Sequence, residues 1–240
     1  MQDLGETKET QARASESAPD KGLSRRRAMT VSAAVAGAGL ASVPAVAEAA
    51  TGGAVSLGKT GTTTVEFRGR VLQSGATGQS FTSFGYLIRA SHAKRGDLFR
   101  GTPLSEATAL LTAYATGVLQ ARTVDMAVHS LDIVGTMTVY QRRQPGASFS
   151  DPSSFRVGTA VARYNMTLQD ILTVFATDTG LPTLTGDMVQ TAAHALSGSL
   201  AGQTFGKNGT RLRFFATGIG QRITPAPNAQ LEIAGNWSIE

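Results

Sequence analysis

The clearest structural signal in the chain is VHSLDIVGTMTVY, residues 128–140. Alternate positions from Leu131 to Val139 are apolar or glycine, and the positions between them are polar, with Val134 as the exception. Successive side chains of a β-strand point to opposite faces, so a period of two predicts a strand with one buried face and one face toward solvent.

The same pattern continues on both sides of this stretch. We expect strands at Val65–Val71, Phe81–Ala90, Phe155–Asn165, Met188–Leu196, Ser199–Phe205, Leu212–Ile219 and Leu231–Ile239. Two segments are ambiguous. Leu104–Val124 predicts two strands that break at Gly117, with a short helix capped by Ser105 as the alternative. Met166–Ala176 suits a continued strand or a helical turn. Outside these two segments, we expect a loop at His92–Pro103 and a break between strands at Thr179–Pro182.

About eight to ten strands at spacings of roughly 10–20 residues predict an all-β domain over 65–240. We favour a single antiparallel β-barrel over a β-sandwich. Closure removes the sheet edges that an exported protein without disulfides has reason to avoid. Glycines within the expected strands also suit the bends of a strongly coiled barrel; they are Gly69, Gly85, Gly135, Gly158 and Gly218.

The N-terminal segment 1–49 has the layout of a signal peptide. Basic residues at 25–27 precede an apolar run that ends near the small-residue cleavage candidates at 45–49. We expect a flexible lead-in at 50–64. A transmembrane anchor is disfavoured, because the run is only mildly hydrophobic and contains Pro44. We therefore expect no stable membrane insertion.

Ser24-Arg25-Arg26-Arg27 resembles the twin-arginine class of export signal. Arg25 and Arg26 are the paired arginines, whereas Ala28 replaces the usual Phe; the ordinary secretory pathway is the alternative. The resemblance implies bacterial export of a folded protein by the twin-arginine translocase. The destination would be the periplasmic, cell-wall or extracellular space.

Composition argues against several classes of site. The chain has no cysteine, so disulfides, iron–sulfur clusters and thiol nucleophiles are excluded. Three histidines make a His-rich metal site improbable, and we expect no metal and no cofactor. A phosphate-loop match at 53–60 lacks the preceding strand and following helix that its chemistry needs. The net charge is +5, but the basic residues are scattered, so we expect no nucleic-acid partner.

Candidate site residues are few. His129 continues the apolar face of 128–140 and is a weak candidate for an acid/base or ligand contact at the mouth of a barrel, with Asp132 as a possible partner. A hydrogen-bonded rim histidine is the plainer interpretation. Side chains that could line a ligand pocket are Tyr86, Tyr114, His129, Met137 and Trp237.

In strand number, length and export, the chain resembles small antiparallel barrels of the lipocalin, allene oxide cyclase and dirigent types. That resemblance implies a cavity for one small apolar molecule. The first hypothesis is a non-enzymatic binder of a small hydrophobic ligand, and the second is a cofactor-free isomerase or cyclase. The third is a structural or surface-interaction domain without a pocket, and a homo-oligomer is possible. A cavity of roughly 300 Å³ or more would favour the first two.

Overall fold

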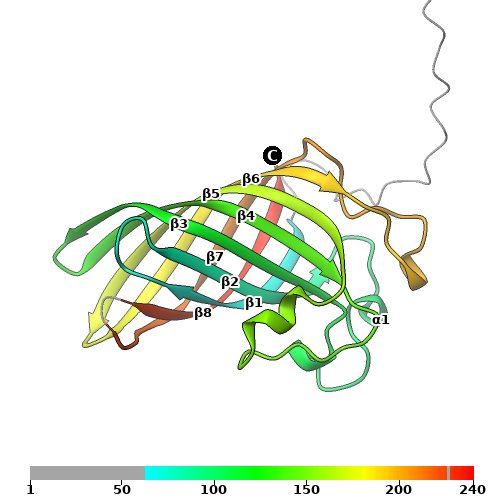
Figure 1. The fold of residues 1–240 in the computed structure, drawn as a ribbon, viewed down its shortest axis with the longest axis horizontal. Helices are drawn as coiled ribbons and strands as arrows, with labels where there is room; N and C mark the ends of the chain where they lie inside the picture. The colour runs from blue at the N-terminus through cyan, green and yellow to red at the C-terminus, as the bar shows by residue number, and fades with distance from the viewer. Residues whose placement is uncertain (1–62, 226–227) are drawn as a thin grey trace, which may run out of the picture. The chain divides into compact units, whose positions relative to one another are not determined.

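A computed structural model of the chain describes residues 63–225 and 228–240, and these form a closed β-barrel (Figure 1). Each strand pairs antiparallel with the next, and β8 pairs with β1 to close the sheet. The all-β prediction is confirmed, and the barrel rather than the sandwich is correct. The strands are β1 (Thr63–Gln73), β2 (Ser80–Ala90), β3 (Leu111–Asp125), β4 (Val128–Gln141), β5 (Thr159–Ala176), β6 (Thr179–Ala193), β7 (Arg211–Arg222) and β8 (Ala229–Ile239).

The expected signal peptide, 1–49, lies outside the described residues, as does the expected lead-in except for its last two residues. Thr63 and Thr64 already belong to β1. Within the part of the chain that the structure describes, no helix has the length and apolar character needed to cross a membrane.

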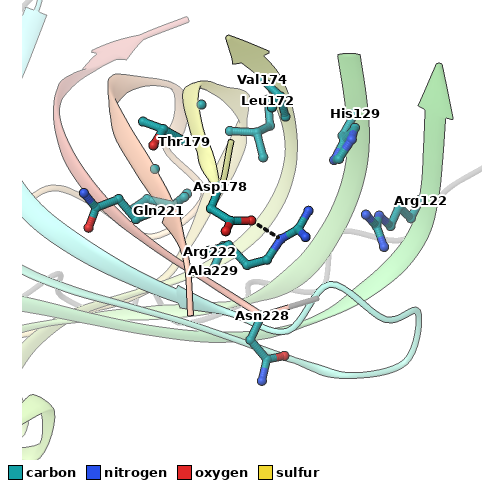
Figure 2. Close-up of a pocket in the computed structure, with 13 residues that line it drawn as sticks. Arg122, His129, Leu172, Val174, Asp178, Thr179, Gln221, Arg222, Asn228 and Ala229 are labelled. Carbon is teal, nitrogen blue, oxygen red and sulfur yellow. Dashed lines mark ion pairs between the residues drawn. The ribbon is translucent and has the colours of Figure 1, made fainter. Parts of the chain in front are cut away.

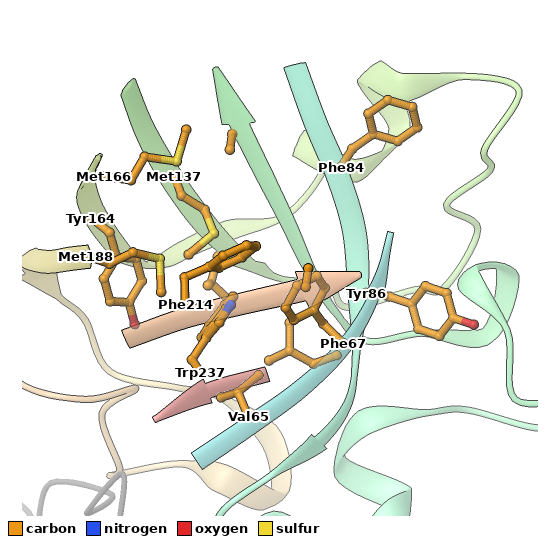
Figure 3. Packing of buried hydrophobic residues seen from close by; sticks show 14 of the residues in the cluster. Val65, Phe67, Phe84, Tyr86, Met137, Tyr164, Met166, Met188, Phe214 and Trp237 are labelled. Atoms are coloured by element: carbon orange, nitrogen blue, oxygen red, sulfur yellow. The ribbon is translucent and has the colours of Figure 1, made fainter. Parts of the chain in front are cut away.

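The interior of the barrel is a packed apolar core. The alternation predicted for β4 is confirmed, since Leu131, Ile133, Met137 and Val139 are all buried. Trp237 of β8 packs against Phe67 of β1, with ring centroids 5.9 Å apart (Figure 3). The alternate residues of the strands fill the interior, as a small barrel of this strand number allows.

Glycines in the wall let neighbouring strands approach closely. Gly135 of β4 pairs with Gly117 of β3, and a Cβ at Gly135 would lie 2.2 Å from the carbonyl oxygen of Thr116. It would also lie 2.9 Å from the terminal methyl of Met166, so the large Met166 side chain occupies the space that Gly135 leaves. Glycine is therefore required here for strand contact and for core packing together.

The two ends of the barrel differ. Short hairpin turns join β1–β2, β3–β4, β5–β6 and β7–β8 at one end, which we call the mouth, at the left of Figure 1. Long connections at the other end carry α1 (Arg95–Leu98) and the short 3-10 helices η1 (Glu106–Thr108), η2 (Pro152–Arg156) and η3 (Gly198–Leu200). Leu98, Leu196 and Phe205 from these connections are buried, so this end is covered.

Several local predictions need correction. Gly117 does not break a strand, because it lies mid-way along β3 opposite Gly135. The short helix considered after Ser105 is only the single 3-10 turn η1. The loop predicted at 92–103 contains the short helix α1. Ser199–Phe205 is not a strand: it begins within η3 and continues as a turn that leads to a single isolated bridge between Thr204 and Ala195. The predicted break at 179–182 is wrong, since β6 begins at Thr179.

The ambiguous segment 166–176 continues β5, which runs for 18 residues. Both neighbouring strands satisfy its backbone hydrogen bonds along nearly its full length. Tertiary pairing therefore overrides the local helical signal.

Candidate ligand-binding site

A small cavity of about 50 Å³ lies at the mouth of the barrel (Figure 2). Its lining comes from the mouth ends of β3 to β8 and from the turns between them. Arg122 and His129 come from β3 and β4, Leu172 from β5, and Arg222 from β7. Residues distant in sequence therefore meet here only because the barrel closes.

Three basic side chains border this cavity. Arg122 donates a hydrogen bond from Nη1 to the carbonyl oxygen of Gly75, 3.0 Å away, which holds it against the β1–β2 turn. Arg222 forms an ion pair with Asp178, with 3.3 Å between Nε and Oδ1. In Figure 2, Arg122 and His129 lie on one side of the cavity and the Arg222–Asp178 pair on the other.

The electrostatic effect of this grouping is visible at His129. Burial lowers the pKa of His129 below its ordinary value, and the positive charges of Arg122 and Arg222 lower it further. Both causes disfavour the protonated ring. The neutral form of His129 is therefore favoured. Since Asp178 already offsets the charge of Arg222, Arg122 is the cation that a bound anion would face.

The floor of the cavity is apolar. Leu172 and Leu231 form it, next to Gly180 and Gly220 in the wall. A Cβ at Gly180 would lie 2.8 Å from Cδ1 of Leu172, and one at Gly220 would lie 2.7 Å from Cδ2 of Leu231. The two leucines thus fill the space beside the glycines, which leaves a shallow apolar base under a charged rim.

Asp170 lies in the wall one inward position deeper than Leu172, and it is fully buried. Its partners across the strands are Leu131 and Leu184, so its surroundings are apolar. Neither carboxylate oxygen makes a hydrogen bond to the described residues. Burial raises the pKa of Asp170 to about 7, and the nearby backbone of Thr183 offsets only part of that rise.

The predicted site residues do not form one cluster. His129 lies at the mouth, where it lines the small cavity. Met137 and Trp237 belong to the packed interior, where they border a void of about 20 Å³. Tyr86 points away from the barrel interior in Figure 3, and it is buried where it packs edge-on against Phe99 of the covering segment.

Tyr114 and Asp132 also lie on the outer wall. The guanidinium of Arg156 lies over the Tyr114 ring, 5.1 Å from its centroid. Asp132 faces outward beside Gln169, whose amide lies 3.5 Å away. Since Asp132 and His129 are three residues apart on one strand, they occupy opposite faces and do not meet.

Sequence reasoning missed Arg122, Asp170, Asp178 and Arg222. Arg122 faces the mouth because the β3–β4 register shifts between Leu119 and Ala121, which moves the inward positions by one residue. A single sequence does not reveal such a bulge. The burial of Asp170 could have been predicted from the sequence, because the period of two places it on the same face as Met166, Leu168 and Leu172, which are all apolar.

Among the described residues, no group of three or more His, Cys, Asp or Glu side chains is placed to hold a metal ion. Comparison with known proteins found no matching protein family, no matching curated protein and no matching solved structure.

Proposed function

We propose that the mouth of the barrel binds a small amphiphilic anion, with its apolar end against Leu172 and Leu231 and its anionic group at the rim. The observation that carries the proposal is the position of Arg122, beside His129 and the Arg222–Asp178 ion pair, over an apolar floor. Guanidinium groups bind carboxylates through charge-assisted, often bidentate hydrogen bonds. Arg122 suits this role because its hydrogen bond to Gly75 already orients it.

The size of the cavity limits what enters. A volume of about 50 Å³ is well below the ~300 Å³ of a pocket that encloses a drug-sized ligand. The ligand therefore inserts only a short apolar group, and the remainder stays at the surface. For the first hypothesis, this supports a binding site at the mouth rather than in the barrel centre.

A packed interior favours the third hypothesis, a surface-interaction domain, as the second candidate function. The void beside Met137 and Trp237, about 20 Å³, has room for no more than a water molecule. The cyclase hypothesis needs an enclosed substrate with polar groups around it. It therefore has less support than the binding hypothesis or the surface-interaction hypothesis. We further propose that the twin-arginine motif directs this domain out of the bacterial cytoplasm.

The binding proposal is tested by isothermal titration with octanoate as the anionic probe and octanol as its neutral counterpart. We expect octanoate to bind more tightly than octanol. Arg122→Gln should weaken octanoate binding about tenfold, the loss of one charge-assisted contact. The control is Arg211→Gln, an exposed arginine at the start of β7, far from the mouth, which should bind as the unmodified protein does.

The pH dependence supplies a second readout. A bound anion stabilises protonated His129, so octanoate affinity should rise as the pH falls through the lowered pKa of His129, and His129→Gln should remove that rise. Equal affinity for octanoate and octanol, or equal loss in the Arg122 and Arg211 variants, would overturn the proposal.

A further inference from the structure

A groove of about 470 Å³ lies at the covered end of the barrel, opposite the mouth. Three parts of the chain line it: the segment around α1 between β2 and β3, the end of β4, and the segment around η3 between β6 and β7. All three are at the right of Figure 1. The groove is separate from the cavity at the mouth, because the two share no lining residue.

Hydrogen bonds tie the parts that form the groove to one another. Gln141, at the end of β4, binds Ser197 through both of its amide atoms. Its Nε2 donates to the carbonyl oxygen of Ser197 at 3.0 Å, and its Oε1 accepts from the backbone N–H at 2.8 Å. Ser199 Oγ donates to the carboxylate of Asp97 in α1. A ligand would therefore meet a preformed groove, which lowers the cost of ordering on binding.

The groove is lined by three arginines but by only one carboxylate. Arg100 and Arg143 are exposed, whereas Arg142 is buried. None of the three forms an ion pair with the residues that the structure describes. The carboxylate, that of Asp97, already accepts two hydrogen bonds from within the domain. The lining therefore carries an excess of positive charge.

Arg142 is the costliest of these charges. Only 8% of the residue is exposed, and burying a guanidinium without a carboxylate partner is unfavourable. Its Nε donates to the carbonyl oxygen of Gln144 at 3.2 Å, and its Nη1 donates to that of Ser154. Its Nη2 donates no hydrogen bond to the described residues, so this edge of the guanidinium can still bind an acceptor.

Gln144 holds a second guanidinium close to that of Arg142. Its side-chain Oε1 accepts from Nη1 of Arg100 at 2.9 Å, while its carbonyl oxygen accepts from Arg142. Two like charges fixed around one residue repel each other, and an anion beside both would offset that repulsion. Arginine also binds phosphate oxygens in pairs through its planar fork. The arrangement therefore suits a compact group with two or more negative charges.

We propose that this groove binds a hydrophilic ligand through a diphosphate group, which Arg100, Arg142 and Arg143 hold. The site differs from the mouth, where an apolar floor selects a ligand with a hydrocarbon end. Beside the arginines, the lining includes two serines, a glutamine and two glycines, and its large apolar members are Phe99 and Leu110. The groove therefore recognises charge and hydrogen-bond acceptors rather than apolar surface.

Isothermal titration with inorganic pyrophosphate tests this proposal, with acetate as the monoanion for comparison. We expect pyrophosphate to bind at least tenfold more tightly than acetate. Arg143→Gln should weaken pyrophosphate binding about tenfold, because it removes one charge-assisted contact. Arg143 is the residue to change because it is exposed, whereas Arg142 also holds the carbonyl oxygen of Ser154. Far-UV circular dichroism checks that each variant is folded.

Arg68→Gln is the matched control. Arg68 on β1 is also exposed and forms no ion pair with the described residues, but it does not line the groove. This variant should bind pyrophosphate as the unmodified protein does. Arg143→Gln should leave octanoate binding at the mouth unchanged, so the two binding proposals can fail independently.

Three results would each rule out a diphosphate site in the groove. The first is a protein that binds no pyrophosphate, and the second is equal affinity for pyrophosphate and acetate. The third is an equal loss of pyrophosphate affinity in the Arg143 and Arg68 variants, which would show that the net charge of the whole molecule attracts the anion.

Discussion

At the residue scale, Asp170 carries a carboxyl group in an apolar environment, between Leu131 and Leu184 on the neighbouring strands. Its carboxyl group is buried among leucines without a hydrogen-bond partner, and its pKa is raised to about 7. The unfolded chain releases this proton near pH 3.9. The folded state therefore binds the proton more tightly, and stability falls as the pH rises between those two values.

Asp170→Asn should remove this dependence. For the unmodified protein, the Asp170 contribution to the free energy of unfolding should fall by about 4 kcal/mol between pH 4 and pH 8 and then level off. Urea unfolding at a series of pH values measures the difference between the two proteins. The variant should gain relative stability as the pH rises, and parallel pH curves would contradict the assignment.

Sequence reasoning at this scale succeeded where a residue follows the strand period, as Leu131 and Ile133 do, which are buried. The same period predicts His129 on their face. Sequence reasoning failed for Tyr86 and Tyr114, which pack on the outer wall beneath the covering segment. The sequence around a tyrosine does not tell whether its side chain lies inside the barrel or on the outer wall. The difference depends on the long connections that cover the outer wall, and these are seen only in the structure.

At the element scale, the wall depends on strands that touch. A Cβ at Gly218 of β7 would lie 1.8 Å from the carbonyl oxygen of Glu232 on β8 and 3.0 Å from Cα of Ile233. Both contacts are backbone atoms of a paired strand, so neither can rotate away. The clash of an added Cβ with β8 can therefore be relieved only if β7 and β8 move apart.

Gly218→Ala should therefore lower the free energy of unfolding by about 3 kcal/mol, at the upper end for overpacking. Urea denaturation followed by far-UV circular dichroism measures it. Gly96→Ala is the control, since a Cβ at Gly96 of α1 meets nothing within 4 Å. An equal effect of both substitutions would show that strand contact at Gly218 is not the cause.

Strand prediction was strongest for β4 and β8, where alternation is nearly unbroken. It was weakest for β3, where Gly117 looked like a break. Gly117 sits within a strand because its partner is also a glycine, Gly135, and the two backbones approach across the pair. That pairing is a long-range property that local sequence does not carry.

At the scale of the whole molecule, Trp237 links distant parts of the barrel. It is the only tryptophan of the chain, and its ring packs against Phe67 of β1 and Tyr164 of β5. Because β8 closes the sheet on β1, loss of the Trp237 side chain affects the closure of the barrel as well as the packing of its interior.

Trp237→Ala should lower the free energy of unfolding by about 3–5 kcal/mol, the usual cost of such a cavity. Phe175→Ala, at a site 58% exposed on β5, should change it by less than about 0.5 kcal/mol. In the unmodified protein, tryptophan fluorescence and far-UV circular dichroism should report the same urea midpoint. Separate midpoints would mean that the closing strand unfolds on its own.

The mouth site could not be predicted as a unit, because its members meet only after all strands are in register. Arg122, His129 and Arg222 lie on three strands that span more than half of the barrel's circumference. The sequence predicts that there is a barrel and that His129 is near its end. It does not predict which charges share that end.

Closure of β8 on β1 has a consequence for how the domain resists aggregation. An open sheet presents unpaired backbone groups that can template aggregation, whereas this barrel pairs every strand on both sides. Aggregation through strand addition therefore requires the seam to open first. The working lifetime of the domain is then set by the rate of that opening, a kinetic barrier, rather than by its equilibrium stability.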